Sequence, residues 1–293
     1  MSRPIRIAGM GALLPGASNL MEYEAALFSP SWERRAVIET LPTKDYIDVK
    51  QRRRMGRLSR MAVIAGKMAI EDAGKELDNK KAGIFLGTGY GEVEHCYKFF
   101  EELYCKDPIR SPTAFINSLH STAASYLCIE LRFTGMVLVF SDLMQSFETA
   151  FLAAYRKLKT GQISQAVVIG ADCATRVLQD VGSLISPGVV LREGACAIML
   201  VAGNENGVIV EDVTVNSRGD DIPDLIYANR GLDDFIGRFG LNPTGGGFEI
   251  VNGALALERQ KTPYTGAPSR GKVAVLKSRS QNTRSIRTRL AIR

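Results

Sequence analysis

The chain has 293 residues, of which 45% are hydrophobic, and it carries a net charge of +6 at neutral pH. This length supports one large domain or two fused halves around a sizeable core, and no apolar run is long enough to span a bilayer. The five cysteines are odd in number, scattered and without a C-x-x-C pair, which indicates reduced thiols in a cytoplasmic protein.

The first part of the chain predicts a strand, an irregular region and a helix. Residues 5–10 predict a first strand rather than a signal peptide, and Gly9-Met10-Gly11 predicts a tight turn after it. Residues 17–50 predict a loop-rich insertion with short helices. Residues 57–73 carry apolar side chains at helical spacing and end at Gly74, which predicts an amphipathic helix with a glycine stop.

A glycine-rich segment follows the second predicted strand, at residues 82–86. Gly87-Thr88-Gly89-Tyr90-Gly91 has the spacing G-x-G-x-G and lacks the wider spacing of a dinucleotide fingerprint. We interpret these glycines as permitting close backbone packing, with cofactor phosphate binding as the alternative. Helices are predicted over residues 92–104 and 115–131.

The centre of the chain predicts a strand-to-helix elbow. Residues 136–140 read as a strand, 141–146 as a sharp turn, 147–160 as a helix and Gly161 as its stop. Many α/β enzymes present an attacking side chain at such an elbow, with helix N-terminal amides beneath it. Here the elbow offers Met144, whose thioether cannot be deprotonated to become a nucleophile.

The remaining elements alternate strands with one helix. The pattern predicts buried strands at 165–170 and 195–201, an edge strand at 208–215, a helix at 248–258, and closing strands at 273–276 and 289–292. Several strands are apolar on both faces, which favours an α/β fold with a mostly parallel sheet covered on both sides.

Positive charge is concentrated in two places. The last 34 residues contain nine basic residues and no acidic one, so residues 1–259 sum to −3. This tail lacks interleaved aromatics and is expected to form the closing strands, which argues against nucleic-acid binding. The second cluster could dock an acidic partner or could be ordinary solvated surface; it comprises Lys50, Arg52, Arg53, Arg54, Arg57 and Arg60.

Six short motifs, taken together in order and spacing, resemble one enzyme family. They are Ile7-Ala8-Gly9-Met10-Gly11-Ala12, Arg57-Leu58-Ser59-Arg60-Met61-Ala62 leading to Glu71-Asp72-Ala73-Gly74, Ile84-Phe85-Leu86-Gly87-Thr88-Gly89, Ser111-Pro112-Thr113-Ala114-Phe115, Val167-Val168-Ile169-Gly170-Ala171-Asp172 and Arg192-Glu193-Gly194-Ala195-Cys196-Ala197. The chain resembles the β-ketoacyl synthase branch of the thiolase-fold condensing enzymes over most of its length.

The resemblance implies a thiolase-like, layered α-β-α-β-α sandwich of two similar halves, dimeric through the strand next to the elbow. We expect a single thiolase-like domain over residues 1–293. Its N-terminal half, 1–170, carries the elbow. Its C-terminal half, 171–293, is shortened because the region between Val201 and Gly240 is much shorter than in full-length members.

The family's chemistry needs a Cys at the elbow and two His that stabilise an enolate and assist decarboxylation. Counting back from Gly161 places Met144 at the nucleophile position. Asn229, or Arg230, stands at the first His position, and Gly240 stands at the second. The closing glycine turn of the family corresponds to Arg279-Ser280-Gln281-Asn282. The resemblance therefore implies a chain that is not a competent condensing enzyme on its own.

No other residues replace this set in the sequence. His95 and His120 match no catalytic position and are expected to be structural or surface residues. Cys173 follows a predicted core strand and Cys196 lies in one, so both are expected to act as small buried hydrophobes. No His, Cys or Asp cluster has metal-ligand spacing, and no cofactor is expected.

The resulting hypothesis is a non-catalytic ketosynthase-like subunit, similar to a chain length factor, that pairs with an active β-ketoacyl-acyl-carrier-protein synthase. Residues expected to line an acyl tunnel or a subunit interface, or simply to fill the core, are Phe115, Met136, Gln145, Ser146 and Phe147. Arg52, Arg53, Arg54, Arg57 and Arg60 would contact an acyl carrier protein. The alternatives are a homodimeric lipid-binding or scaffold protein, and an acyltransferase or thioesterase with an altered site.

Overall fold

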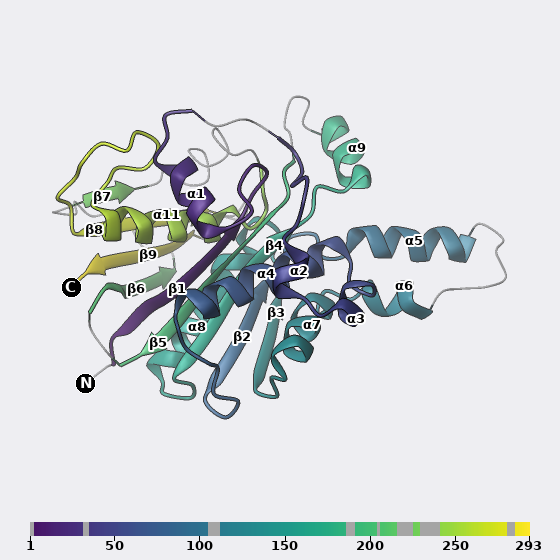
Figure 1. Cartoon of the computed structure of the whole chain (residues 1–293), viewed down its shortest axis with the longest axis horizontal. Coiled ribbons are helices and arrows are strands. Elements are labelled where there is room, and N and C mark those ends of the chain that lie inside the picture. Colours follow the sequence, from purple (N-terminus) through teal and green to yellow (C-terminus); the bar gives the residue numbers. More distant parts are fainter. Residues whose placement is uncertain are drawn as a thin grey trace.

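The computed structural model describes residues 3–31, 35–104, 112–185, 191–203, 206–215, 225–228, 241–279 and 285–293. Within these residues, nine strands form a continuous sheet in the order β3-β2-β4-β5-β1-β6-β9-β8-β7 (Figure 1). The strands are β1 (Ile5–Leu13), β2 (Ala82–Gly87), β3 (Met136–Phe140), β4 (Gln165–Asp172), β5 (Gly194–Ala202), β6 (Val208–Val215), β7 (Leu225–Ala228), β8 (Val273–Arg279) and β9 (Ser285–Ile292).

The sheet consists of two similar halves, as predicted. In the first half β2 runs parallel to β3 and β4, while β5 runs antiparallel to β4 and β1. In the second half β7 runs parallel to β8, and β9 runs antiparallel to β8 and β6. The order β1-β5-β4-β2 of the first half is thus repeated as β6-β9-β8-β7 in the second half. Among the described residues β3 has no counterpart. In the sheet the two halves meet where β1 pairs with β6. Along the chain the strands of the second half begin with β6 at Val208, which is later than the division expected after residue 170.

The prediction of a mostly parallel sheet was wrong, because the ladders within and between the halves are mixed. A strand that is buried on both faces has the same apolar composition in either direction, so its sequence does not report its orientation. β6 was also expected at an edge, yet it lies between β1 and β9.

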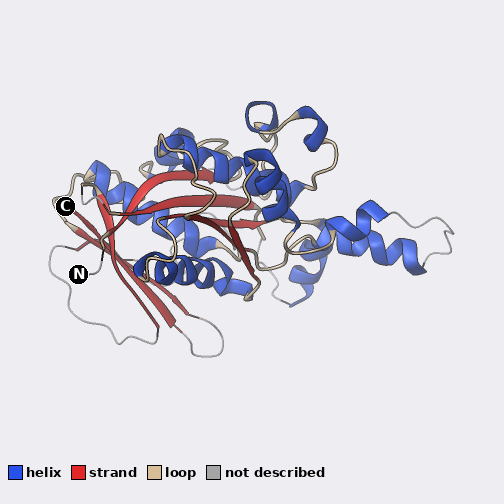
Figure 2. Ribbon diagram, turned by 90° about the horizontal axis from the view of Figure 1, so that it is seen from below, coloured by secondary structure: helices blue, strands red, loops and turns tan. Residues whose placement is uncertain are grey.

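Helices lie on both sides of the strands (Figure 2). α4 (Arg57–Asp72) and α7 (Thr122–Leu131) pack with one face of the first half into one apolar core. α8 (Ser146–Lys159) and α11 (Gly245–Arg259) share a second core, which includes strands of both halves. The other helices are α1 (Leu20–Leu27), α2 (Thr43–Tyr46), α3 (Val49–Arg52), α5 (Val93–Tyr104), α6 (Pro112–Asn117) and α9 (Arg176–Ile185).

Gly9 and Gly11 lie inside β1, so the tight turn predicted there is wrong. A Cβ atom at Gly9 would lie 2.3 Å from the carbonyl oxygen of Ala69, and one at Gly11 would lie 2.4 Å from that of Ala65. Both oxygens belong to α4. The glycines therefore allow this helix to approach the strand closely, rather than turning the chain.

The helix predicted over residues 115–131 is two helices. α6 ends at Asn117 and α7 begins at Thr122. Between them, the ring of His120 packs on Gly91, whose φ of +62° favours glycine.

α5 and α6 project from the body of the molecule as an arm (Figures 1 and 2). No residue of α5, which is described in full, is buried. Several apolar side chains of the arm are exposed: Tyr97, Phe100, Tyr104, Phe115 and Ile116. Across the described part of the chain, no helix combines the length and apolarity needed to cross a membrane.

Candidate functional site

The elbow is a single turn of 3₁₀ helix, Leu143–Gln145, between the end of β3 and the start of α8. Leu143 has φ of +46° and is 61% exposed, which places it at the strained apex of the turn. The Ser146 hydroxyl accepts a hydrogen bond from the Asp142 amide (2.8 Å) and donates one to the Leu143 carbonyl (2.7 Å). Met144 follows Leu143 and is half-buried.

A strained residue at the apex of a strand-to-helix turn is the position from which a nucleophile is presented. The structure places this backbone strain at Leu143, one residue before the Met144 position obtained by counting along the sequence. Spacing along a helix could not reveal a positive φ in the turn that precedes it. Neither Leu143 nor Met144 carries a group that can become an anionic nucleophile.

The glycine-rich loop after β2 packs beneath the elbow. A Cβ at Gly87 would lie 2.5 Å from the carbonyl carbon of Ser146, which supports the interpretation of close packing. The amides of Gly89 and Tyr90 each donate to the Asp172 carboxylate over 2.9 Å. A carboxylate thus already occupies the amides that a bound phosphate would need.

Asp172, at the end of β4, is the centre of a buried polar network. The Thr88 hydroxyl donates to it over 3.0 Å, and the Thr244 side chain lies beside it. The Thr244 amide and hydroxyl donate to Asn242 Oδ1 over 2.9 and 2.8 Å. Complete burial raises the pKa of Asp172 to about 7, and these hydrogen bonds oppose the rise. Asp172 therefore ties the loop below the elbow to the second half of the molecule.

Glu148 brings a second buried carboxyl group to the first turn of α8, and it is 5% exposed. A Cβ at Gly246, in the first turn of α11, would lie 2.0 Å from Glu148 Oε1. The amino ends of two helices favour negative charge at this place.

Residues 30–208, more than half of the chain, match the family model of the β-ketoacyl synthase N-terminal domain. The chain belongs to the β-ketoacyl synthase family.

Two curated β-ketoacyl synthases match part of the chain. It is 25% identical over 166 residues to the chloroplastic 3-oxoacyl-[acyl-carrier-protein] synthase I of Arabidopsis thaliana, covering 54% of this chain and 35% of that one. It is 30% identical over 139 residues to 3-oxoacyl-[acyl-carrier-protein] synthase 2 of Staphylococcus aureus strain MRSA252, covering 41% and 34%. The chain thus spans about a third of the length of these relatives.

Solved structures share the fold over nearly the whole chain. A chain of the AntDE:AntF complex, a type II polyketide synthase acyl-carrier protein with its ketosynthase, superposes with a TM-score of 0.82 at 12% identity, covering 99% of this chain and all of that one. A chain of the ishigamide ketosynthase/chain length factor gives 0.77 at 13% identity, covering 99% of both. A β-ketoacyl synthase of Burkholderia phymatum STM815 gives 0.74 at 15%, covering 100% of both. The chain has the thiolase-like fold of these ketosynthases.

Cys173 and Cys196 of this β-ketoacyl synthase family member are both buried. Burial raises the pKa of Cys173 and of Cys196, so both thiols are protonated at neutral pH. Cys196 lies in β5 within the core, and Cys173 follows β4. Both positions agree with their expected role as small buried hydrophobes.

The two histidines lie near the base of the arm. His95 Nδ1 is 3.1 Å from Glu92 Oε2, and the Ser59 hydroxyl donates to Glu92 Oε1 over 2.5 Å. Because the acid stands between the serine and the histidine, this group is not a Ser–His–acid relay. Among the residues that the structure describes, no cluster of His, Cys, Asp and Glu could hold a metal ion.

The five residues that were expected to line a tunnel or an interface, or to fill the core, differ in their burial. Phe147 is fully buried and stacks with Phe151, their ring centroids 6.0 Å apart. Gln145 and Ser146 are also buried, whereas Met136 is half-buried on β3 and Phe115 is exposed on the arm. Asn229, Arg230, Gly240 and the segment 280–282 lie outside the described residues.

The arginines of the basic cluster in this ketosynthase homologue differ in exposure and in their partners. Arg53 and Arg54 are exposed, and Arg52, Arg53 and Arg60 surround a shallow hollow beside Val49. Arg57 is turned inward, and its Nε and Nη2 donate to Glu193 over 2.8 and 2.5 Å. Arg57 therefore stabilises the start of β5. Arg60 is half-buried, and its Nη2 donates to the Arg52 carbonyl oxygen over 2.8 Å.

The burial of Asp172 has a pH consequence that an Asp172→Asn variant tests. Its folded pKa of about 7 exceeds the ordinary value of 3.8, so between these values the folded state holds more protons than the unfolded state. Its contribution to stability is therefore present at low pH and is lost as pH rises from about 4 to about 7. We expect urea unfolding of the wild type to show an additional decline, on the order of 4 kcal/mol, that the variant lacks. Parallel wild-type and variant curves would contradict this assignment.

Proposed function

We propose that this chain is a non-catalytic ketosynthase-like subunit that pairs with an active β-ketoacyl-acyl-carrier-protein synthase in fatty-acid or polyketide-type biosynthesis in the cytoplasm. The observation that carries this proposal is the elbow itself. Its strained apex is retained in the backbone, but its side chains are Leu143 and Met144. Maintaining a strained turn without a nucleophile is consistent with a role in shaping a shared interface.

The free edge of β3 supports pairing. Within the described residues, β3 pairs with β2 on one side and with no strand on the other. Val137 on this strand is 37% exposed, and apolar Ile129 and Leu143 nearby in the chain are 52% and 61% exposed. An uncovered apolar edge strand is a template for another chain. Some fold neighbours are themselves ketosynthase/chain length factor pairs, which fits a partner at this edge.

The arginines around α3 support a carrier protein as a further partner, because Arg53 and Arg54 are exposed and Arg52 and Arg60 are half-buried beside them. Arg52, Arg53, Arg54 and Arg60 come from adjacent turns at α3 and the start of α4. Such a patch attracts an acidic protein surface, and the attraction weakens with salt. An acyl carrier protein bound to the ketosynthase partner would therefore contact this chain as well.

Co-expression with an intact ketosynthase encoded beside this gene tests the proposal. We expect a one-to-one complex that survives size-exclusion chromatography, with a molar mass measured by light scattering equal to the sum of both chains. A stable homodimer that takes up no ketosynthase would favour the scaffold alternative, and a monomer under all conditions would refute both.

Restoring a thiol at the elbow should not restore condensation. We expect Leu143→Cys and Met144→Cys, tested separately because the apex and the counted position differ by one residue, to form no β-ketoacyl product from acyl and malonyl carrier-protein thioesters. The reason is that the sequence supplies Asn229 and Gly240 in place of both histidines. Product detected by mass spectrometry from either purified variant would remove the non-catalytic assignment.

A further inference from the structure

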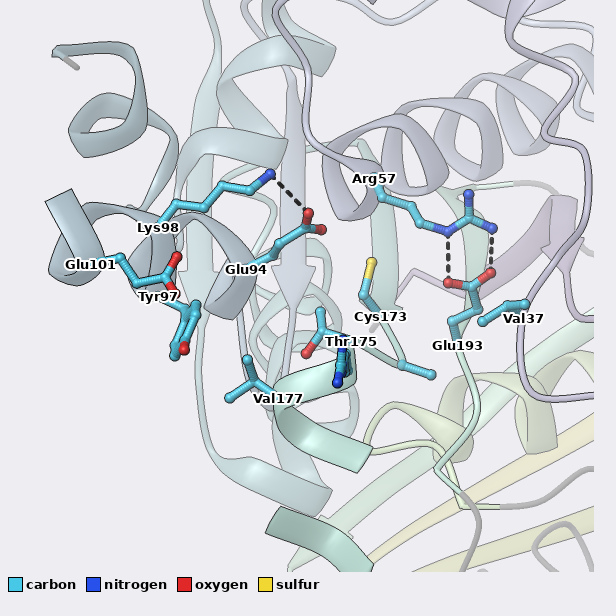
Figure 3. Close-up of a pocket in the computed structure, with 12 residues that line it drawn as sticks. Val37, Arg57, Glu94, Tyr97, Lys98, Glu101, Cys173, Thr175, Val177 and Glu193 are labelled. Carbon is cyan, nitrogen blue, oxygen red and sulfur yellow. Dashed lines mark hydrogen bonds and ion pairs between the residues drawn. The ribbon is translucent and has the colours of Figure 1, made fainter. Parts of the chain in front are cut away.

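A pocket of about 370 Å³ opens between α5, α9 and the start of α4 (Figure 3). Its apolar lining consists of Val37, Tyr97, Cys173, Ala174 and Val177. Its volume is at the low end for small-molecule sites, so it fits a group of medium size.

The pocket is separate from the elbow. Of the described residues, none from 141–147 lines it. Cys173 packs in the apolar core on the α4 side of the sheet, whereas Phe147 of α8 packs in the core on the opposite side. A molecule bound here would not occupy the place where the family's reaction occurs.

The charges around the pocket balance. Lys98 pairs with Glu94 at 3.0 Å, and Arg57 pairs with Glu193. The two remaining charged lining residues, Glu101 and Arg176, have opposite signs. An anionic or cationic ligand would have to compete with pairs that already exist, whereas an uncharged ligand would disturb none of them.

We propose that this pocket binds an uncharged, mainly apolar small molecule, of medium aliphatic or single-ring size, between α5 and α9. Such a ligand would cover part of the inner face of α5, a helix without a buried residue of its own. Removal of apolar surface from water would drive binding and would hold the arm against the body. This site goes beyond the proposed subunit role, because it requires neither a ketosynthase nor a carrier protein.

Cys173 provides a reporter inside the pocket. The purified wild-type protein is treated with N-ethylmaleimide at mildly alkaline pH, with and without 1-octanol, and alkylation of each cysteine is followed by peptide mass spectrometry. Cys128, half-buried on α7 and outside the pocket, is the internal reference. We expect octanol at about four times its Kd to slow alkylation of Cys173 about fivefold, with Cys128 unchanged. Octanoate, which has the same chain length and a negative charge, should protect less.

Filling the pocket should abolish the response. In Ala174→Phe, or in Val177→Phe if the first variant unfolds, Cys173 should react slowly whether or not octanol is present. Met21→Phe, at an exposed position on α1, should retain the wild-type protection. If the buried Cys173 thiol does not react, saturation-transfer NMR of 1-octanol replaces the alkylation measurement, and its signal should be lost in Ala174→Phe and kept in Met21→Phe. Equal slowing of Cys173 and Cys128, or an octanol response that persists in the filled variant, would overturn the proposal.

Discussion

A Val137→Asp substitution on β3 is expected to abolish the complex with the ketosynthase partner. Val137 is 37% exposed in the isolated chain, so an aspartate there remains hydrated and the fold is little affected. In the complex the same carboxylate would be buried between two apolar edges without a partner, which costs about 3 kcal/mol or more. That cost corresponds to roughly a hundredfold or greater loss of affinity.

The measurement is a titration of the labelled ketosynthase with wild-type and variant chains, combined with thermal unfolding of each chain alone. Met21→Asp on α1 is the matched control, because Met21 is a more exposed apolar residue on a distant element. Val137→Asp with wild-type affinity would show that the partner does not use β3. Equal losses from both variants would point to a general effect of charge.

A Gly9→Ala substitution is expected to destabilise the fold by about 3 kcal/mol, which is a large effect for the addition of one methyl group. The new Cβ would lie 2.3 Å from the Ala69 carbonyl oxygen and 2.4 Å from the Ala73 amide nitrogen. Both are backbone atoms at the end of α4, so no side-chain rotation can relieve the clash. The strand and helix would have to separate, which would open the core between them.

The free energy of unfolding in urea measures this loss. Gly253→Ala in α11 is the control, because the nearest atoms to its added Cβ are side-chain carbons at 3.2–3.4 Å. Alanine also has a better helix propensity than glycine, so the control should lose much less stability than Gly9→Ala. A Gly9→Ala variant as stable as the control would contradict the close approach of β1 and α4.

Local patterns in the sequence predicted much of the first half of the fold. Apolar residues at helical spacing located α4 and α8, and Gly74 and Gly161 end these helices with φ of +58° and +72°. These signals are local, because helix periodicity and a left-handed stop depend on residues within a few turns of one another. The predicted closing strands at the end of the chain are confirmed as parts of β8 and β9.

Predictions failed where the outcome depended on residues far away in the chain. Gly9-Met10-Gly11 has the composition of a turn, and only the position of α4 shows why glycine is needed inside a strand. The direction of each strand and the central place of β6 depend on which strands are its neighbours. Arg57 belongs to a basic cluster in the sequence, and only Glu193, 136 residues later, decides that its side chain points inward.

The sequence by itself determined that the elbow has no thiol or hydroxyl nucleophile at Met144, because the side chain at a position is fixed by its residue type. It also determined the family resemblance, because the motifs that carry it are short and ordered along the chain. The tertiary structure decided that the strained apex is Leu143, that Asp172 occupies the loop amides, and that β3 is left with a free edge. Backbone strain, burial of a carboxyl group and exposure of an edge arise only when distant segments pack together, so no local pattern encodes them.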